Sequence, residues 1–233
     1  MKLIMTGVTG AAGSQMYLSA IADPAVTHIT VLARRALPDW LPLPAAPSTG
    51  RPAPELTVEV LPDFLNYPAD LSARLATHDA CIWALGRTAN GVSEEEYTKF
   101  TYDYVMHAVE ALQAGGVAAH RGGGATDPFR FVFVSGEGAD PEEKSMMMFG
   151  RIKGRTEKYL TSLPPSSGVT AAIMRPAYFF PSHETFRQHT RGLGGRAADT
   201  VLAPLLRTLF PVGFTPVDKM GVRGGAGERG LGE

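Results

Sequence analysis

Short apolar runs alternate along the chain with longer stretches in which apolar residues recur every three or four positions. The apolar runs predict strands at 2–6, 28–33, 56–61, 80–85, 129–135 and 169–175, of which 28–33 alternates and is β-branched. The longer periodic stretches predict helices at 14–22, 69–76, 93–114, 148–161 and 200–208. Regular alternation of strand and helix is typical of parallel βαβ units. The pattern therefore predicts an α/β fold with a doubly wound parallel sheet and helices on both faces.

Two stretches interrupt this rhythm. Residues 38–54 are rich in proline and alanine and contain Trp40, and residues 119–127 are rich in glycine. Both are expected to be surface insertions between elements of one domain. That domain is predicted to span 1–220, with a small substrate-side segment at about 176–220. Residues 221–233 are polar and glycine-rich, and are expected to form a disordered tail.

The turn after the first predicted strand carries a regular set of glycines. Gly7, Gly10 and Gly13 are separated by two residues each, and a predicted helix follows at once. Glycine allows a sharp turn and close approach of a pyrophosphate, and the N–H groups that begin the helix then face the anion. The placement between strand and helix predicts a Rossmann-type nucleotide-binding turn.

Two arginines follow the second predicted strand. In a Rossmann unit the end of this strand lies beside the adenosine ribose, where an acidic residue binds the 2′-hydroxyl of NAD. Arg34 and Arg35 stand there instead and suit a 2′-phosphate through charge-assisted hydrogen bonds. We expect NADP(H) as the cofactor. The alternative is that both arginines are solvated loop residues.

Composition narrows the functional classes. The chain has 233 residues, a formal net charge of −1 and 19% charged residues, so nothing favours a nucleic-acid partner. Cys81 is the single cysteine and is expected to be a buried small hydrophobe, which excludes a disulfide framework within the chain. No apolar run is long enough to span a membrane, and the N-terminus does not resemble a signal peptide. His183 and His189 lack a third ligand at suitable spacing, so no metal site is predicted.

The order of short motifs resembles an atypical short-chain dehydrogenase/reductase. The branch it resembles comprises the human Tat-interacting-protein-type oxidoreductases and their fungal mitochondrial relatives. The matching elements cover about residues 1–218. They read TGVTGAAG from Thr6, LARR from Leu32, DF at 63–64, ALG at 84–86, DYV at 103–105, SGEGAD from Ser135, FGRIKGRTE from Phe149 and RP at 175–176.

The resemblance implies a cofactor site made of residues that follow the strand ends. These are Gly7, Thr9, Gly10, Ala12, Gly13, Arg34, Arg35, Asp63, Phe64, Leu85, Gly86, Lys153, Pro176 and Phe179. It further implies an active-site serine, Ser135, and a lysine, Lys153, that bonds the nicotinamide ribose and lowers the pKa of a tyrosine. Structural alternatives stand beside these roles. Asp63 and Phe64 could cap a strand, Ser135 could simply end one, and Lys153 could be a solvated helix residue.

The chain departs from the family at the catalytic tyrosine. The family pattern is Tyr-x-x-x-Lys, whose two side chains share one helical face. Here Phe149 occupies the tyrosine position four residues before Lys153. Loss of a general acid typically costs about 10²–10⁴-fold in rate. Tyr178, after the sixth predicted strand, is the candidate substitute donor.

Three functions follow from these observations. The first is NADPH-dependent reduction of a small organic carbonyl or activated alkene. The second is a non-redox sensor or scaffold that binds NADP(H), and the third is a lyase or cyclase that uses the former reductase pocket. A small-molecule substrate and a monomer or homodimer are expected. Residues 201–214 are expected to pack over the substrate cleft or, alternatively, to contact a membrane surface or a protein partner. The predicted location is intracellular, in the cytoplasm or, alternatively, on the mitochondrial outer membrane surface.

Overall fold

Six parallel strands form one sheet in the computed structural model, which describes residues 1–46, 50, 52–121 and 127–176. The strands are β1 (Lys2–Thr6), β2 (His28–Ala33), β3 (Glu55–Val60), β4 (Ala80–Trp83), β5 (Phe129–Val134) and β6 (Val169–Met174). Their order in the sheet is β3-β2-β1-β4-β5-β6. This is the doubly wound order of a Rossmann fold, which confirms the predicted fold class. The six predicted strands differ from the observed ones by at most two residues at either end.

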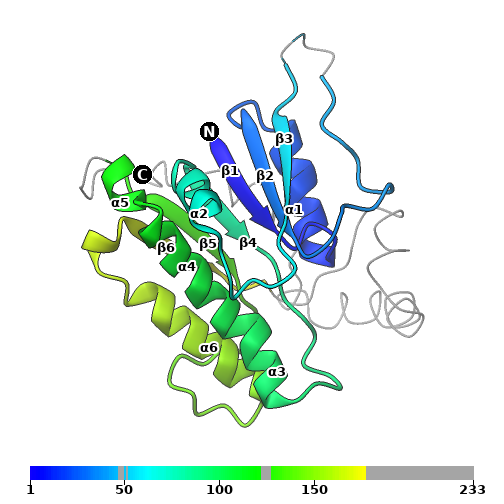
Figure 1. Cartoon of the computed structure of the whole chain (residues 1–233). Helices are drawn as coiled ribbons and strands as arrows, with labels where there is room; N and C mark the ends of the chain where they lie inside the picture. The colour runs from blue at the N-terminus through cyan, green and yellow to red at the C-terminus, as the bar shows by residue number, and fades with distance from the viewer. Residues whose placement is uncertain (47–49, 51, 122–126, 177–233) are drawn as a thin grey trace, which may run out of the picture.

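Helices cover both faces of the sheet (Figure 1). One face carries α1 (Ala11–Ala22). The other carries α2 (Ala69–Ala76), α4 (Tyr104–Ala114) and α6 (Met148–Thr161). The single helix predicted at 93–114 is a continuous run of α3 (Glu94–Thr98), a π-helical segment η1 (Lys99–Asp103) and α4. Two short helices were not predicted, α5 (Val117–His120) and the 3-10 helix η2 (Pro165–Ser167).

Two apolar layers hold these elements together. Between the sheet and α1 lie the side chains of one strand face, among them Leu3, Met5, Ile29 and Val31, each at most 3% exposed. The opposite layer is aromatic, and in it the rings of Trp83 and Phe131 stack at 5.8 Å. Because strands with both faces covered are apolar throughout, the short unbroken runs in the sequence correspond to these strands. Cys81 is buried and free, as predicted.

The carboxyl ends of all six strands meet at one edge of the sheet. At its centre β1 pairs with both β2 and β4, so that Thr6 lies opposite Leu32 on one side and Trp83 on the other. Strand order reverses at this point, and ligands of open α/β sheets bind in the crevice that such a reversal leaves. The buried Thr6 side chain links the end of β1 to the segment after β4, since its Oγ1 accepts a hydrogen bond from the Leu85 N–H at 3.1 Å.

Several predictions fall outside the described residues. These are the helix at 200–208, Tyr178, Phe179, His183, His189, the segment 201–214 and the tail 221–233. In the part of the chain that the structure describes, no helix is long and apolar enough to cross a membrane. Among those same residues, no cluster of histidine, cysteine, aspartate and glutamate could hold a metal ion.

Candidate functional site

The glycine turn between β1 and α1 is packed so tightly that two of its glycines have no room for a side chain. Gly7 has a φ of +67°, and a Cβ there would lie 2.3 Å from the Ala84 carbonyl oxygen. A Cβ on Gly13 would lie 2.1 Å from the Gly7 carbonyl oxygen. Gly10 differs, because it is exposed and its added Cβ would meet only that same oxygen, at 3.2 Å. Gly7 and Gly13 therefore shape the turn, and Gly10 keeps its outer surface open.

The open end of α1 suits an anion. Gly10 is the N-cap of this helix and offers no side-chain hydrogen bond to the first turn, which also contains no acidic residue. The first N–H groups of an α-helix have no partner within the helix, and the helix dipole adds partial positive charge there. Thr9 lies exposed beside them, and Ala12 is buried within the helix. The geometry fits the phosphate cradle that the sequence predicts.

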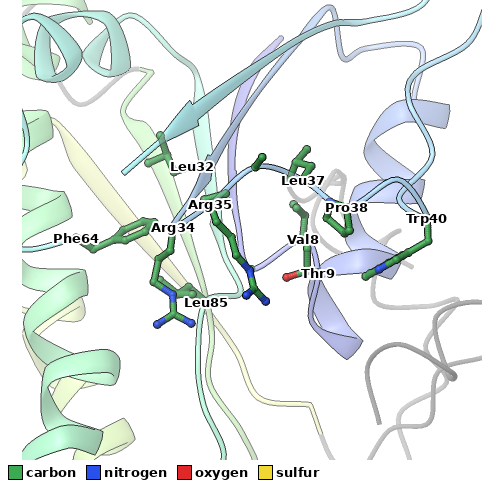
Figure 2. A pocket seen from close by; sticks show the side chains of 13 residues that line it. Val8, Thr9, Leu32, Arg34, Arg35, Leu37, Pro38, Trp40, Phe64 and Leu85 are labelled. Atoms are coloured by element: carbon green, nitrogen blue, oxygen red, sulfur yellow. The ribbon is translucent and has the colours of Figure 1, made fainter. Parts of the chain in front are cut away.

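A cavity of about 320 Å³ opens beside this turn (Figure 2). Its walls come from the glycine turn, from the end of β2 and the segment after it, and from the aromatic core. The lining residues are Gly7, Val8, Thr9, Leu32, Ala33, Arg34, Arg35, Ala36, Leu37, Pro38, Trp40, Phe64 and Leu85. The first glycine of the turn and the two arginines predicted to bind cofactor therefore share one cavity.

Both arginines are available to an anion. Arg34 and Arg35 are exposed, and Figure 2 shows their side chains pointing to the same side of the cavity, with the Arg35 guanidinium between Leu85 and Thr9. Within the described residues neither arginine forms an ion pair with a carboxylate. The Arg34 guanidinium lies over the Phe100 ring, 5.4 Å from its centroid.

The start of the proline-rich stretch belongs to the cavity, which corrects the prediction that 38–54 is only a surface insertion. Pro38 and Trp40 line the cavity. Leu41 is 4% exposed, and the Tyr17 hydroxyl of α1 donates a hydrogen bond to the Pro42 carbonyl at 3.0 Å. These contacts anchor the segment to α1. A tryptophan within a stretch rich in proline and alanine was the signal in the sequence that pointed to such a role.

Of the remaining residues predicted on the cofactor side, some line the cavity and others do not. Phe64 and Leu85 line the cavity, and Phe64 is also fully buried against Tyr104, with ring centroids 5.5 Å apart. Asp63 and Gly86 are not among the lining residues. The Asp63 carboxylate accepts the Leu65 N–H at 3.2 Å and so caps the turn after β3, in line with its structural alternative.

A second group gathers at the ends of β5 and β6. The Lys153 ammonium on α6 donates hydrogen bonds to the carbonyl oxygens of Ser135 at 2.7 Å and Val134 at 3.1 Å. It lies 5.5 Å from the centroid of the Phe149 ring. That ring packs against Gly136, where a Cβ would lie 2.7 Å from the ring Cζ. The three predicted catalytic positions that the structure describes are thus brought together.

The Ser135 hydroxyl lacks a hydrogen-bond partner among the described residues, and the Lys153 ammonium has a lowered pKa. The Ser135 hydroxyl oxygen is buried, and no other described residue gives it a hydrogen bond. Burial lowers the pKa of Lys153 to about 8, although the nearby Glu157 carboxylate opposes this shift. Glu157 is itself 3% exposed and accepts a hydrogen bond from Arg175 Nε at 2.9 Å. Buried, unsatisfied or shifted groups in a cleft are typical of functional sites.

The buried Pro176 extends β6 toward this group, because its carbonyl accepts the Glu137 N–H at 3.1 Å. Tyr178 and Phe179 follow it in sequence but lie outside the described residues. The two groups of residues occupy the ends of β1, β2 and β4 and the ends of β5 and β6, along one sheet edge. The glycine turn would be filled by added side chains, and the buried Ser135 hydroxyl has no hydrogen-bond partner among the described residues. Both features fit a nicotinamide dinucleotide that lies along that edge.

Comparison with solved structures identifies the fold. A short-chain dehydrogenase/reductase from Mycobacterium ulcerans superposes with a TM-score of 0.64 and 17% identity, covering 96% of this chain and 81% of that protein. An oxidoreductase of the same family from Burkholderia thailandensis gives 0.60 and 15%, covering 95% and 82%. The Bordetella bronchiseptica enzyme WbmG, solved with NAD, gives 0.53 and 14% over 77% of this chain, which spans only 54% of that enzyme. The chain has the Rossmann fold of the short-chain dehydrogenases/reductases.

Sequence comparison identifies the family. No family model matches the chain. A curated protein from Emericella nidulans, fmp52, which is named as mitochondrial, is 30% identical over 188 residues. The match covers 80% of this chain and 70% of that protein. The chain that carries these two groups of site residues therefore belongs to the fmp52 family.

Proposed function

We propose that the protein binds NADP(H) and reduces a small organic carbonyl or an activated alkene. The observation that carries this proposal is the cavity in which the glycine turn and two arginines without carboxylate partners among the described residues face the same opening. The solved relatives support a nicotinamide dinucleotide in general, since WbmG is described in complex with NAD. The preference for the phosphorylated cofactor is our inference from Arg34 and Arg35.

The arginine pair supports this preference on physical grounds. A planar guanidinium donates two parallel hydrogen bonds to a phosphate, and charge-assisted bonds are stronger than neutral ones. A free 2′-hydroxyl would instead require an acceptor, and the first two positions after β2 offer only Arg34 and Arg35. The same cavity would therefore hold NADPH better than NADH.

The chemistry of reduction would be divided between the cofactor and this chain. When bound, the nicotinamide supplies a hydride. The chain must then provide a proton for the substrate oxygen or carbon. Lys153, with a pKa of about 8, is mostly protonated at neutral pH and lies beside Ser135, whose hydroxyl has hydrogen-bonding capacity to spare. Phe149 cannot take part, so the proton comes through Ser135 and Lys153, from Tyr178, or from water.

A specific observation also favours a second candidate, a non-redox protein that binds NADP(H) as a sensing or structural ligand. Phe149 fills the donor position with a ring that packs on Gly136, and Lys153 already gives hydrogen bonds to two backbone carbonyls. A site built this way retains its shape without a phenolic donor. The cofactor part of the proposal is common to both candidates.

Two finer assignments belong to the proposal as well. Within the short-chain dehydrogenases/reductases, the motifs from Thr6 to Pro176 support the Tat-interacting-protein-type branch. The name of the Emericella nidulans relative supports a mitochondrial location for this chain, in preference to the cytoplasm.

Steady-state kinetics test the redox proposal directly. The purified protein is assayed for NADPH oxidation against a panel of quinones and reactive aldehydes, with NADH in parallel and Lys153→Met as the control variant. We expect slow, saturable turnover that prefers NADPH and is lost in the variant. Tight NADPH binding without turnover on any substrate would reject the redox proposal in favour of the non-redox candidate.

A further inference from the structure

We infer that Phe100 is a positioning residue for the cofactor's 2′-phosphate, acting through Arg34. The ring of Phe100 is a platform on which the Arg34 guanidinium lies, with its carbon 5.4 Å from the ring centroid. This inference rests on the proposed NADP(H) binding and assigns to it a residue outside every motif noted in the sequence. The occupant of the site is the phosphate monoester that distinguishes NADP(H) from NAD(H).

The platform is fixed in place by its own contacts. The Phe100 ring meets the Tyr104 ring edge to face, at 5.2 Å between centroids and 90° between planes. Tyr104 is 3% exposed and packs against the fully buried Phe64, which lines the cavity. The aromatic core therefore extends to Phe100, and through it to a guanidinium that is otherwise exposed to solvent.

Contact with the ring face leaves the Arg34 guanidinium free to bind an anion. A cation within about 6 Å of an aromatic centroid is attracted by the ring face. The phenylalanine ring has no hydrogen-bonding atom, so contact with it leaves all five N–H donors of the guanidinium for a phosphate. Arginine side chains are otherwise mobile, and holding Arg34 in place before binding lowers the entropy cost of contact. Phe100 thus preorganises Arg34.

The backbone around Phe100 is unusual in a way that fits this role. Phe100 lies in η1, the π-helical segment between α3 and α4. A π turn holds more residues than an α turn and so rotates the side chains in it relative to a regular helix, and such turns are frequent at functional sites. The segment is secured from α6, where the Thr156 hydroxyl donates a hydrogen bond to the Thr101 carbonyl at 3.2 Å.

A second guanidinium shares the platform. The carbon of the Arg87 guanidinium lies 5.8 Å from the same ring centroid, and Arg87 is also ion-paired with Glu96. Arg34 comes from the end of β2 and Arg87 from the segment after β4, so one ring gathers cations from two strand ends. Glu96 already neutralises Arg87, whereas Arg34 has no carboxylate partner among the described residues, so Arg34 is the guanidinium on this ring that is available to a phosphate.

Calorimetric titration of NADPH and of NADH tests the inference. Phe100→Leu keeps the apolar contact with Tyr104 but removes the aromatic face. We expect NADPH binding to weaken about 2- to 5-fold, the range for an exposed cation–π contact, with NADH binding unchanged. Phe100→Tyr, which keeps an aromatic face, should bind NADPH as tightly as wild type. Tyr102→Leu is the matched control, since Tyr102 lies on the same segment with its ring 5.8 Å from Arg155, and it should leave both affinities unchanged.

The outcomes separate this inference from the function on which it rests. Equal loss of NADPH and NADH binding in Phe100→Leu would show a purely structural role and overturn the inference, as would unchanged binding of both. If Arg34→Ala/Arg35→Ala selectively loses NADPH while Phe100→Leu does not, the inference fails and the proposed function stands. If the double variant loses nothing, the proposed function fails.

Discussion

Lys153 carries a charge in surroundings that oppose it. Its pKa is about 8 in the folded chain against 10.5 for a free lysine. Below pH 8 the folded and unfolded states both hold the proton. Between pH 8 and 10.5 the unfolded state keeps a proton that the folded state has lost, so the contribution of Lys153 to the free energy of unfolding rises with pH in that window.

Lys153→Met is predicted to remove this rise. Methionine keeps most of the apolar stem of lysine but has no ionisable group. Urea denaturation of wild type and variant at several pH values across the window measures the difference between the two slopes, which cancels the contribution of the other titrating groups. Parallel pH profiles would show that the Lys153 ammonium is not desolvated in solution.

Phe149 stands where the resemblance to short-chain dehydrogenases/reductases leads us to expect a tyrosine. Phe149→Tyr would add one oxygen at the Cζ atom that faces Gly136, beside Ser135 and close to Lys153. A nearby ammonium favours the phenolate and lowers the tyrosine pKa. Since a general acid contributes about 10²–10⁴-fold, we predict at least a tenfold rise in NADPH oxidation with quinones or aldehydes.

Phe149→Leu is the control for this gain, because it changes the packing on Gly136 without adding a donor. If wild type is already a fast reductase and Phe149→Tyr changes nothing, another group donates the proton. Tyr178→Phe would then be the next variant to assay.

At the level of elements, two glycines of the β1–α1 turn are predicted to affect different properties, Gly10 the binding of NADPH and Gly13 the stability of the fold. Gly10→Val places its branched side chain on the exposed surface of the turn, where the first Cβ is only slightly tight. We predict that this variant loses NADPH binding but keeps a thermal midpoint close to that of wild type. Normal NADPH affinity in Gly10→Val would mean that the turn does not approach a pyrophosphate.

Gly13→Ala, three residues on, is predicted to behave in the opposite way. Its Cβ would lie 2.1 Å from the Gly7 carbonyl oxygen, so the turn or the helix must move. Such overpacking typically costs about 1–3 kcal/mol, and we expect a corresponding loss in the free energy of unfolding by urea titration. Unchanged stability would contradict the observed packing of α1 on the turn.

Periodicity located the elements well but could not describe their inner geometry. The strand predictions succeeded because each predicted apolar run ends at or next to a glycine, an arginine, a serine or a proline. The helix at 93–114 was predicted as one element, and its apolar spacing does not reveal the π turn at Lys99–Asp103. That turn depends on which carbonyl each N–H reaches and on Thr156, a residue more than fifty positions away.

For the whole molecule, the sequence predicted which strand ends border the candidate site but not every residue that lines its cavity. Gly7, Arg34 and Arg35 follow predicted strand ends, and parallel strands must bring those ends to one edge of the sheet. Trp40 and Phe100 reach the same region through contacts between distant segments, which no local spacing encodes. For the same reason the sequence left two roles open for Asp63, which caps a turn in the structure and stays a predicted cofactor contact.

The central claim is that Arg34 and Arg35 select the phosphorylated cofactor, and isothermal titration calorimetry tests it most directly. Wild type and the Arg34→Ala/Arg35→Ala variant are each titrated with NADPH and with NADH. We predict that wild type binds NADPH more tightly, and that the double variant loses on the order of 10-fold or more for NADPH, as expected for hydrogen bonds to a charged group, while NADH changes little. Equal affinity of wild type for the two cofactors, or undiminished NADPH binding by the variant, would contradict the account.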